Sequence, residues 1–390
     1  MAANTHTDEL YEQYGELQRN FPVLRNEEGV VYLSRYADCV RLLSDPVFSR
    51  TAPDSSMPFA DAAQRPGILE SMISQWMVFM DPPRHERVRQ AFAVAFSARA
   101  VKSLEPLVRE QVRHLLEDWP ADGQLEVVSD FAFLLPVRVI AVMLGVPLTD
   151  VPRIHAWAGG LTTALDSGTQ DALRDGEGVA RELADYFRAL IARREQLPAD
   201  CLINQVALSV GANLSEEEFL YGCMFLLWAG HETTKNLLSS GLLLLAQHPQ
   251  QLLRLKAQPD LLDNALDEIL RVESPLQKLS RWSMVDSEFS GFRVPAGTLI
   301  TALIGAAHRD PLEFANPDSF EIARERNRHI AFGSGIHHCL GIWLARLEAR
   351  IAFSELLPRL QQLEVVDYRW RELPAFRSLD FLQMKVRLEC

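Results

Sequence analysis

The chain is poor in cysteine and carries no sign of export. Its 390 residues contain five cysteines, an odd number without the regular spacing of a disulfide framework (Cys39, Cys201, Cys223, Cys339 and Cys390). The N-terminal residues MAANTHTDELYEQYGELQRN lack the apolar segment of a secretory signal. We therefore expect a protein of the reducing cytoplasm.

A long uninterrupted apolar run and an excess of positive charge are also missing. The longest apolar stretch, residues 219–245, is interrupted by His231, Glu232 and Lys235, which a membrane span rarely carries. The net charge of −13 argues against general nucleic-acid binding, which normally needs a basic face. We expect neither a membrane span nor a nucleic-acid partner.

What the sequence does contain is typical of a soluble globular protein, with 48% hydrophobic and 23% charged residues. Residues 22–34 predict a hairpin around the turn NEEG, and residues 84–275 show helical periodicity almost throughout. Strand patterns return at 280–302 and near 362–389. No linker, repeat or alternating βαβ pattern is present, so we expect a mostly α (α+β) fold with residues 1–390 in one domain.

One long helix is predicted in the middle of the chain. Ser215 followed by Glu218 forms the pattern of a capping box, and the periodicity then continues to about Gln247, just before a proline. At 1.5 Å per residue this helix is roughly 45–50 Å long, enough to cross the whole molecule.

The centre of that helix, AGHETT at residues 229–234, is unusual because glycine, an acid and two threonines are poor choices for a buried helix. One interpretation is a kinked helix with a solvated polar patch. The other is a groove in which a flat ligand lies against Gly230, beside a carboxylate (Glu232) and a hydroxyl (Thr233) that can relay protons.

The stretch FGSGIHHCLG at residues 332–341 places Cys339 at the mouth of a predicted helix. A zinc site needs three or four ligands, but the two histidines are adjacent to the cysteine and no C-x-x-C partner exists. A nucleophilic cysteine stays possible. A thiolate held for a larger cofactor explains more, because the helix N-terminus favours the thiolate, and Gly335 and Gly341 allow close approach of a planar group. Such a thiolate is a good axial ligand for haem iron.

Together these residues resemble the cytochrome P450 family of haem-thiolate monooxygenases. Phe332, Gly335, His337, Cys339 and Gly341 fit its cysteine-loop pattern F-x-x-G-x-[HR]-x-C-x-G. Five further motifs follow the family's order along the chain: H-x-x-x-R at residues 85–89 after DPP at 81–83, [AG]-G-x-[DE]-T-[TS] at 229–234, E-x-x-R at 268–271, P-x-x-x-x-x-R at 275–281 and A-[NH]-R-D-P at 307–311.

The resemblance implies the family's triangular helical prism with a small β-rich lobe, and haem b with Cys339 as the iron ligand. Haem carries two propionates, which need cationic partners. The positions that serve them in relatives are occupied by His85, Arg89, Arg281 and His337. Further cofactor contacts are implied for Ala229, Gly230, Phe332, Gly335 and Gly341. We expect Glu268 and Arg271 to form a structural ion pair.

The implied activity is monooxygenation with O2 as co-substrate, with Glu232 and Thr233 delivering protons. Relatives that use peroxide or reduce nitric oxide tend to lack an intact acid–threonine pair. A non-catalytic haem-binding sensor or carrier is the alternative, which would explain Cys339 but does not need Glu232 and Thr233. Lys235 departs from the family pattern, where an apolar residue is expected.

Electrons must come from a separate ferredoxin and ferredoxin reductase, because no G-x-G-x-x-G motif follows a strand and we expect no flavin in this chain. An acidic ferredoxin would suit a basic surface near Cys339. The arginines expected to form that surface are Arg84, Arg87, Arg89, Arg324, Arg326, Arg328, Arg346 and Arg350.

The substrate implied by the resemblance is a small lipophilic natural product such as a polyketide or macrolide intermediate, with terpenoids and fatty acids left open. Residues 50–80 correspond to the family's variable loop over the pocket, and residues near 155–185 to its lid helices. Apolar and aromatic side chains there suggest an adaptable pocket. Its expected lining is Trp76, Val78, Phe79, Phe225, Leu276, Leu279 and Leu382.

Overall fold

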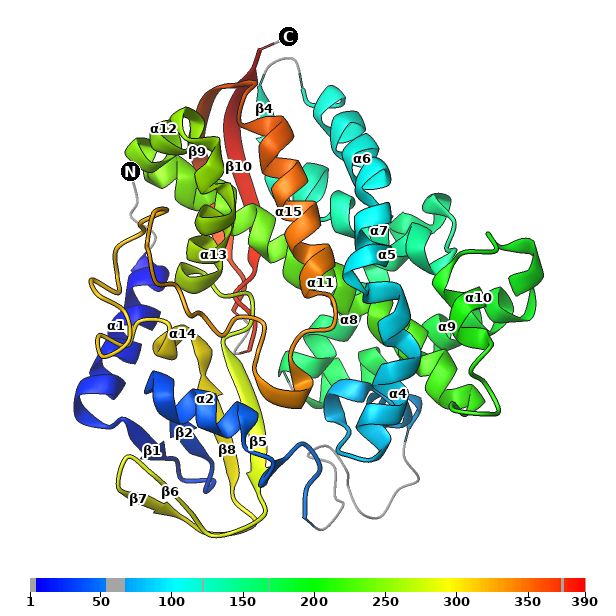
Figure 1. The fold of residues 1–390 in the computed structure, drawn as a ribbon, viewed down its shortest axis with the longest axis vertical. Coiled ribbons are helices and arrows are strands. Elements are labelled where there is room, and N and C mark those ends of the chain that lie inside the picture. Colours follow the sequence, from blue (N-terminus) through cyan, green and yellow to red (C-terminus); the bar gives the residue numbers. More distant parts are fainter. Residues whose placement is uncertain (1–4, 54–66, 121–122, 168, 373–374, 390) are drawn as a thin grey trace.

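Helices form most of the molecule, and the strands gather mainly in a lobe at its lower left and a hairpin at its top (Figure 1). The computed structural model describes residues 5–53, 67–120, 123–167, 169–372 and 375–389. The α-helices of these residues are α1 (Thr5–Asn20), α2 (Tyr36–Ser44), α3 (Ile68–Ser74), α4 (Arg84–Ala93), α5 (Ala98–Ser103), α6 (Glu105–Glu117), α7 (Leu134–Leu144), α8 (Val151–Ser167), α9 (Gln170–Ala192), α10 (Leu202–Ala207), α11 (Glu216–Gln247), α12 (Pro249–Ala257), α13 (Leu262–Val272), α14 (Ile304–Ala307) and α15 (Ile342–Leu356).

The strands form three small sheets. They are β1 (Val23–Arg25), β2 (Val31–Leu33), β3 (Phe48–Ser49), β4 (Gln124–Glu126), β5 (Lys278–Ser283), β6 (Ser287–Phe289), β7 (Phe292–Val294), β8 (Leu299–Leu303), β9 (Leu360–Trp370) and β10 (Leu379–Leu388). One sheet has the order β1-β2-β8-β5-β3, a second β4-β10-β9, and β6 pairs with β7. The predicted hairpin at 22–34 and the later strand segments are confirmed, as is the mostly helical class with a β-rich lobe.

Strand β4 interrupts the region 84–275, which was predicted to be helical almost throughout, at a place that the sequence did not indicate. Its three residues pair with Gln383, Met384 and Lys385 of β10, near the other end of the chain. Three residues are too few to show the alternation of apolar and polar side chains that predicts a strand. The pairing of β4 also depends on a partner more than 250 residues away.

Helix α11 is the central element and packs against α7, α9, α13 and α15. The predicted capping box is present: the Glu218 backbone N–H donates to Ser215 Oγ at 3.0 Å, and the Ser215 N–H donates to the Glu218 carboxylate at 3.0 Å. The helix ends at Gln247, before Pro249, as the pattern predicts.

Glu218 also connects the start of α11 to α4. Its carboxylate accepts hydrogen bonds from Arg87 at 2.7 Å and from Arg84 at 3.0 Å. These bonds, led by the one from Arg87, lower the pKa of Glu218 to about 2 against the opposing effect of burial. The carboxylate therefore stabilises the folded chain in its ionised form.

We expect Glu218→Gln to lower the unfolding free energy by about 1–3 kcal/mol at pH 7, because the folded pKa of Glu218 lies below its unfolded value. The depressed pKa contributes stability above pH 4.5 that is lost as the pH falls toward 2, so the difference between the two proteins should shrink over that range. Denaturant unfolding at several pH values measures this. Glu217→Gln, at an exposed position of the same helical turn, is the matched control; an equal loss in both variants would contradict the assignment.

The short helix α3 begins on a carboxylate from another helix. The backbone N–H groups of Ile68 and Leu69 donate to the two carboxylate oxygens of Glu177 on α9, at 2.8 and 3.0 Å. Unsatisfied N–H groups at a helix start favour an acceptor of negative charge. Glu177 therefore fastens α3 to α9.

Among the residues described, no helix combines the length and the apolar character required to cross a membrane.

Candidate functional site

A buried ion-pair network holds the segment that leads to Cys339. Both Glu268 and Arg271 on α13 have side chains with 0% exposure, and Arg271 Nε and Nη2 each donate to the Glu268 carboxylate at 2.8 Å. Glu268 also accepts hydrogen bonds from Arg324 Nε at 3.0 Å and from Asn327 Nδ2 at 3.0 Å. The predicted ion pair is present, and its carboxylate fixes residues 324–327 ahead of the cysteine loop.

His308 extends this network toward the loop. Its Nδ1 donates to the Arg271 carbonyl at 3.1 Å, and its Nε2 accepts the backbone N–H of Ile330 at 2.8 Å. The loop then closes on itself, since the Cys339 N–H donates to the Phe332 carbonyl at 2.9 Å. The position of Cys339 is therefore set by backbone contacts anchored at α13.

The two predicted loop glycines serve different purposes. Gly335 has φ +69°, and a Cβ there would lie 2.6 Å from the Leu43 carbonyl oxygen on α2. The positive φ confirms the tight turn predicted at Gly335, and the predicted approach of a planar group there stays a prediction. A Cβ at Gly341 would meet nothing nearer than a Phe96 ring carbon at 4.0 Å. No described residue thus requires a glycine at 341, which fits a planar cofactor beside Cys339.

The protonation of Cys339 reflects opposing influences. Burial raises the pKa of the thiol, while a hydrogen bond from the Gly341 backbone N–H and the charge of Arg89 lower it. The helix N-terminus thus acts in the predicted direction, although burial has the larger effect. A metal ion bound at Cys339 would add positive charge and favour the thiolate further. Arg89 itself donates to the His338 carbonyl at 2.7 Å.

A zinc site receives no support. Among the described residues, no group of three or more His, Cys, Asp or Glu side chains is arranged to hold a metal ion. A metal at Cys339 would therefore take its other ligands from outside the chain, as haem iron takes nitrogen ligands from its porphyrin.

Buried cationic and donor groups converge close to the cysteine loop. The rings of His85 on α4 and His337 lie 4.3 Å apart, and both nitrogens of His85 and Nε2 of His337 have no hydrogen-bond partner in the described part of the chain. Arg281 on β5 is 4% exposed, and Nη1 donates to the Ser280 carbonyl at 2.9 Å. Buried donors that lack acceptors fit an anionic ligand, and two propionate carboxylates match this need.

Arg50 completes this group, although no sequence pattern singled it out. Its side chain donates to the Val78 carbonyl at 2.8 Å and the Ser280 carbonyl at 2.6 Å. Burial lowers the pKa of His337 to about 2, helped by the charges of Arg281, His85 and Arg50. Burial lowers the pKa of Arg281 to about 9, and Arg50 contributes. We call His85, Arg281, His337 and Arg50 the cationic cluster, after the charges of its two arginines; the two histidines, whose pKa values are lowered, are neutral hydrogen-bonding groups.

On α11, Phe225, Ala229 and Thr233 follow one another at intervals of four residues, so they share one face of the helix. They are partly exposed, although most of α11 is buried. Gly230 lies off this face: a Cβ there would lie 2.9 Å from Ile140 on α7. The missing side chain of Gly230 therefore makes room for α7, and the predicted contact of its backbone with a flat ligand stays a prediction.

Glu232 and Lys235 form an ion pair inside α11. Lys235 Nζ donates to Glu232 Oε1 at 2.6 Å, and the two side chains are 8% and 5% exposed, respectively. Burial alone would raise the pKa of Glu232, but Lys235, His231 and Arg371 together hold it below its ordinary value. Lys235, which departs from the family pattern, is thus accounted for as the partner of Glu232.

An aromatic cluster lies beside this face of α11. It consists of Trp76, Phe79, Phe225, Trp228 and Phe376. Trp76 is fully buried, with ring centroids 5.3 Å from Trp228, 5.2 Å from Phe225 and 6.5 Å from Phe79. Trp228 is 6.0 Å from Phe376. Three predicted pocket residues thus come together; Trp228 was missed, although its position three residues after Phe225 on one helix would have indicated it.

The other predicted pocket residues are more dispersed. Leu276 bridges to Phe376, and Leu279 shares a face of β5 with Arg281. The Val78 carbonyl is bound to Arg50. Leu382 on β10 is fully buried and belongs to the same main hydrophobic core as Trp76. Within the predicted variable loop, residues 54–66 lie outside the described residues.

The expected basic surface is largely neutralised within the chain. Besides Arg84 and Arg87, three of these arginines have carboxylate partners: Arg324, which is 11% exposed, pairs with Glu268 at 3.0 Å, Arg346 with Asp267 at 2.6 Å and Arg326 with Glu313 at 3.4 Å. Within the described chain, Arg328 and Arg350 are exposed and have no carboxylate partner. Of the predicted broad basic surface, only Arg328, Arg350 and Arg89 therefore remain without a carboxylate partner in the described chain.

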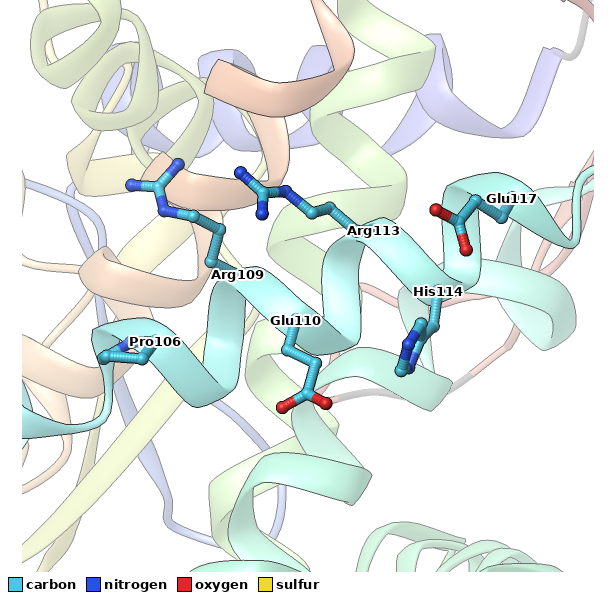
Figure 2. A pocket seen from close by; sticks show the side chains of 6 residues that line it. All are labelled: Pro106, Arg109, Glu110, Arg113, His114 and Glu117. Atoms are coloured by element: carbon cyan, nitrogen blue, oxygen red, sulfur yellow. The ribbon is translucent and has the colours of Figure 1, made fainter.

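A separate surface pocket of about 360 Å³ runs along α6 and contains none of the predicted site residues. Figure 2 shows its lining side chains, all from this one helix: Pro106, Arg109, Glu110, Arg113, His114 and Glu117. Arg109 and Arg113 form ion pairs with Glu355 on α15. These contacts join two helices, and we assign the pocket no chemistry.

Comparisons with known proteins agree with this geometry. The Cytochrome P450 family model matches residues 188–367. A biotin biosynthesis cytochrome P450 of Bacillus subtilis (strain 168) is 40% identical over 357 residues, covering 90% of this chain and 89% of that protein. The polyketide biosynthesis cytochrome P450 PksS of the same organism is 35% identical, covering 91% of this chain and 88% of that protein. A crystal structure of P450BioI in complex with an acyl carrier protein ligated to hexadec-9Z-enoic acid is similar with a TM-score of 0.91 and 37% identity, covering 99% of this chain and 100% of that one.

Proposed function

This chain belongs to the cytochrome P450 family of haem monooxygenases, and on that basis we propose that it inserts one oxygen atom of O2 into a small lipophilic natural product, with electrons from a separate ferredoxin system. The observation that carries the proposal is Cys339 lying in a loop beside the cationic cluster, whose buried histidine nitrogens have no hydrogen-bond partner in the described part of the chain. Family membership favours an enzyme that turns over its substrate, rather than a non-catalytic haem-binding sensor or carrier. We place the reaction in the cytoplasm, in a chain that holds haem b and no flavin.

The residues present fit haem. Cys339 would ligate the iron, and the cationic cluster would bind the propionates. When bound, haem supplies the site at which O2 is activated. The chain's own residues hold that group, keep its surroundings apolar and deliver protons.

We expect Arg281→Ala to weaken haem binding by about 2–4 kcal/mol, because a buried propionate then lacks a charged partner. The thiolate spectrum of the haem that remains should be unchanged. Transfer of haem to apomyoglobin measures the loss. Arg293→Ala, an exposed arginine on β7, is the control. Equal haem retention in the two variants would count against the propionate assignment.

We expect Thr233→Ala to bind substrate and consume NADPH, while product per NADPH falls about tenfold or more and hydrogen peroxide accumulates. The reason is that the Thr233 hydroxyl, on the face of α11 that holds Phe225 and Ala229, directs protons delivered through Glu232. Product, O2 and peroxide are measured together. Thr234→Ala, at the next and buried position, is the control. A fully coupled Thr233→Ala enzyme would exclude this role.

The aromatic cluster supports a lipophilic substrate, because stacked aromatic rings offer apolar contact area without charge. We propose a polyketide or macrolide intermediate, because the similar PksS is a polyketide biosynthesis cytochrome P450, and treat a fatty acyl chain, as in the P450BioI complex, as the second candidate. The test is a panel of such compounds scored by the haem spin-state shift, followed by product analysis with a ferredoxin and its reductase. A panel in which neither class shifts the spectrum would overturn the substrate proposal.

The ferredoxin is proposed to dock near the cysteine loop, where Arg328 and Arg350 are exposed without carboxylate partners in the described chain. Because the neighbouring arginines are paired with carboxylates of this chain, the surface attracts an acidic ferredoxin over long distances less strongly than the number of arginines alone suggests.

A further inference from the structure

The packing of α11 does not require a charged pair at Glu232 and Lys235, since apolar side chains could fill the same space. Both side chains are almost fully buried, and removing two charges from water costs several kcal/mol that an apolar pair would not cost. Lys235 Nζ has one hydrogen-bond acceptor among the described residues, Glu232 Oε1. The charge of Lys235 therefore stabilises this one carboxylate.

Charged and titratable groups continue from the pair toward the surface. The residues whose charge or titration is coupled to Glu232 are His231 and Lys235 on α11, Arg371 just after β9, and His155 on α8. The Phe133 ring lies between the two histidines, with centroid distances of 4.1 Å to His155 and 5.5 Å to His231.

The outer end of this group is a pocket of about 490 Å³ between α8 and α9. Its lining residues are His155, Ala156, Gly159, Gly160, Thr163, Ala172, Asp175 and Arg371. His155 and Asp175 are exposed, so the pocket meets solvent. Arg371 Nη2 donates to Thr163 Oγ1 at 3.4 Å, which places this arginine in the pocket wall.

We propose that this pocket and the Glu232–Lys235 pair form one route by which protons from solvent reach the site, and that Lys235 is a positioning residue that keeps Glu232 a carboxylate. The inference rests on the proposed role of Glu232 in proton delivery. A proton passes from pocket water to the Glu232 carboxylate and then toward Thr233, and Lys235 stays charged throughout. The depressed pKa of Glu232 agrees with this arrangement, because the carboxylate returns to its ionised form after each transfer.

The first test removes the lysine charge with Lys235→Met, at similar volume. Glu232 then loses its hydrogen-bonded cation, so burial raises its folded pKa relative to that in the parent. The variant should lose melting temperature, relative to the parent, as the pH rises from 5 to 8. Lys235→Arg should behave like the parent, and Glu232→Gln/Lys235→Met should lose the added pH dependence. Identical pH dependence in Lys235→Met and the parent would overturn the role of Lys235.

The second test fills the pocket. Gly159 lines the pocket, and a Cβ there would meet no atom within 4 Å, so Gly159→Phe adds a bulky side chain at the pocket without a clash at its Cβ. Gly178→Phe on α9 is the matched control, since a Cβ there is equally free and Gly178 does not line the pocket. We expect product formation to slow several-fold, with a larger solvent deuterium isotope effect, in Gly159→Phe alone. Equal behaviour of the two phenylalanine variants would overturn the route.

Glu232→Gln distinguishes the proposed role of Glu232 in proton delivery from the proposed route through the pocket. Unchanged turnover and coupling in this variant would refute the proposed function of Glu232. Impaired turnover in Glu232→Gln, with parental behaviour in Lys235→Met and Gly159→Phe, would refute the route alone.

Discussion

Cys339→Ser should abolish the red-shifted Soret band of the reduced carbon-monoxide complex, and with it monooxygenation. The band reports a thiolate ligand, and a serine oxygen in the same loop donates less electron density to the iron. Because O–O bond cleavage depends on that donation, product formation should fall below detection even in variants that retain haem. The measurement is the difference spectrum of purified protein, scaled to its haem content.

The other described cysteines provide matched controls, since Cys39, Cys201 and Cys223 are buried, free thiols. Cys39 Sγ already donates to the Leu33 carbonyl at 3.3 Å. Serine at any of these positions should leave the band unchanged. A band that survives Cys339→Ser but disappears in one of the controls would refute the ligand assignment.

Glu268→Leu should lower the unfolding free energy by about 3–5 kcal/mol, because it leaves the fully buried guanidinium of Arg271 without its carboxylate. The loss also frees Arg324 and Asn327, so we expect weaker haem retention although no atom of Glu268 belongs to the loop. Denaturant unfolding and haem content measure the two effects.

Glu321→Gln is the control for this variant. Its carboxylate pairs with Arg254 at 2.7 Å, but both side chains are 41% exposed, so we expect a loss below about 1 kcal/mol. The double variant Glu268→Leu/Arg271→Met should recover part of the stability, since it removes the unpaired charge. Equal unfolding free energies of Glu268→Leu and Glu321→Gln would contradict the central position of the pair.

The features predicted correctly are those with local signals. Ser215 and Glu218 are three residues apart, so their capping box can be read within one helical turn. Glu268 and Arg271 have the same spacing on α13. The hairpin β1–β2 is set by the turn between Asn26 and Gly29. Each of these depends on neighbours along the chain, which the sequence displays directly.

The features that the sequence did not predict depend on distant partners. The glycines illustrate this, because a glycine in the sequence does not show which neighbouring atom fills the place of its side chain. That neighbour is Ile140 for Gly230 and the Leu43 carbonyl for Gly335. Arg50 had no motif, and its place in the cationic cluster follows from β5 lying alongside β3. The arginines near Cys339 suggested a basic surface because their carboxylate partners are dispersed along the chain.

The carboxylate of Glu177 at the start of α3 also has a consequence for the order in which the molecule folds. Helix α3 has seven residues, too few to be stable alone, and its first N–H groups, those of Ile68 and Leu69, bond a residue 109 and 108 positions later. Its first turn therefore gains its acceptor after α9 has formed, so α3 should belong to the late-folding, least protected part of the native structure. In hydrogen exchange, the amides of Ile68 and Leu69 then report on α9 as much as on α3, and their protection measures how firmly the two helices stay together.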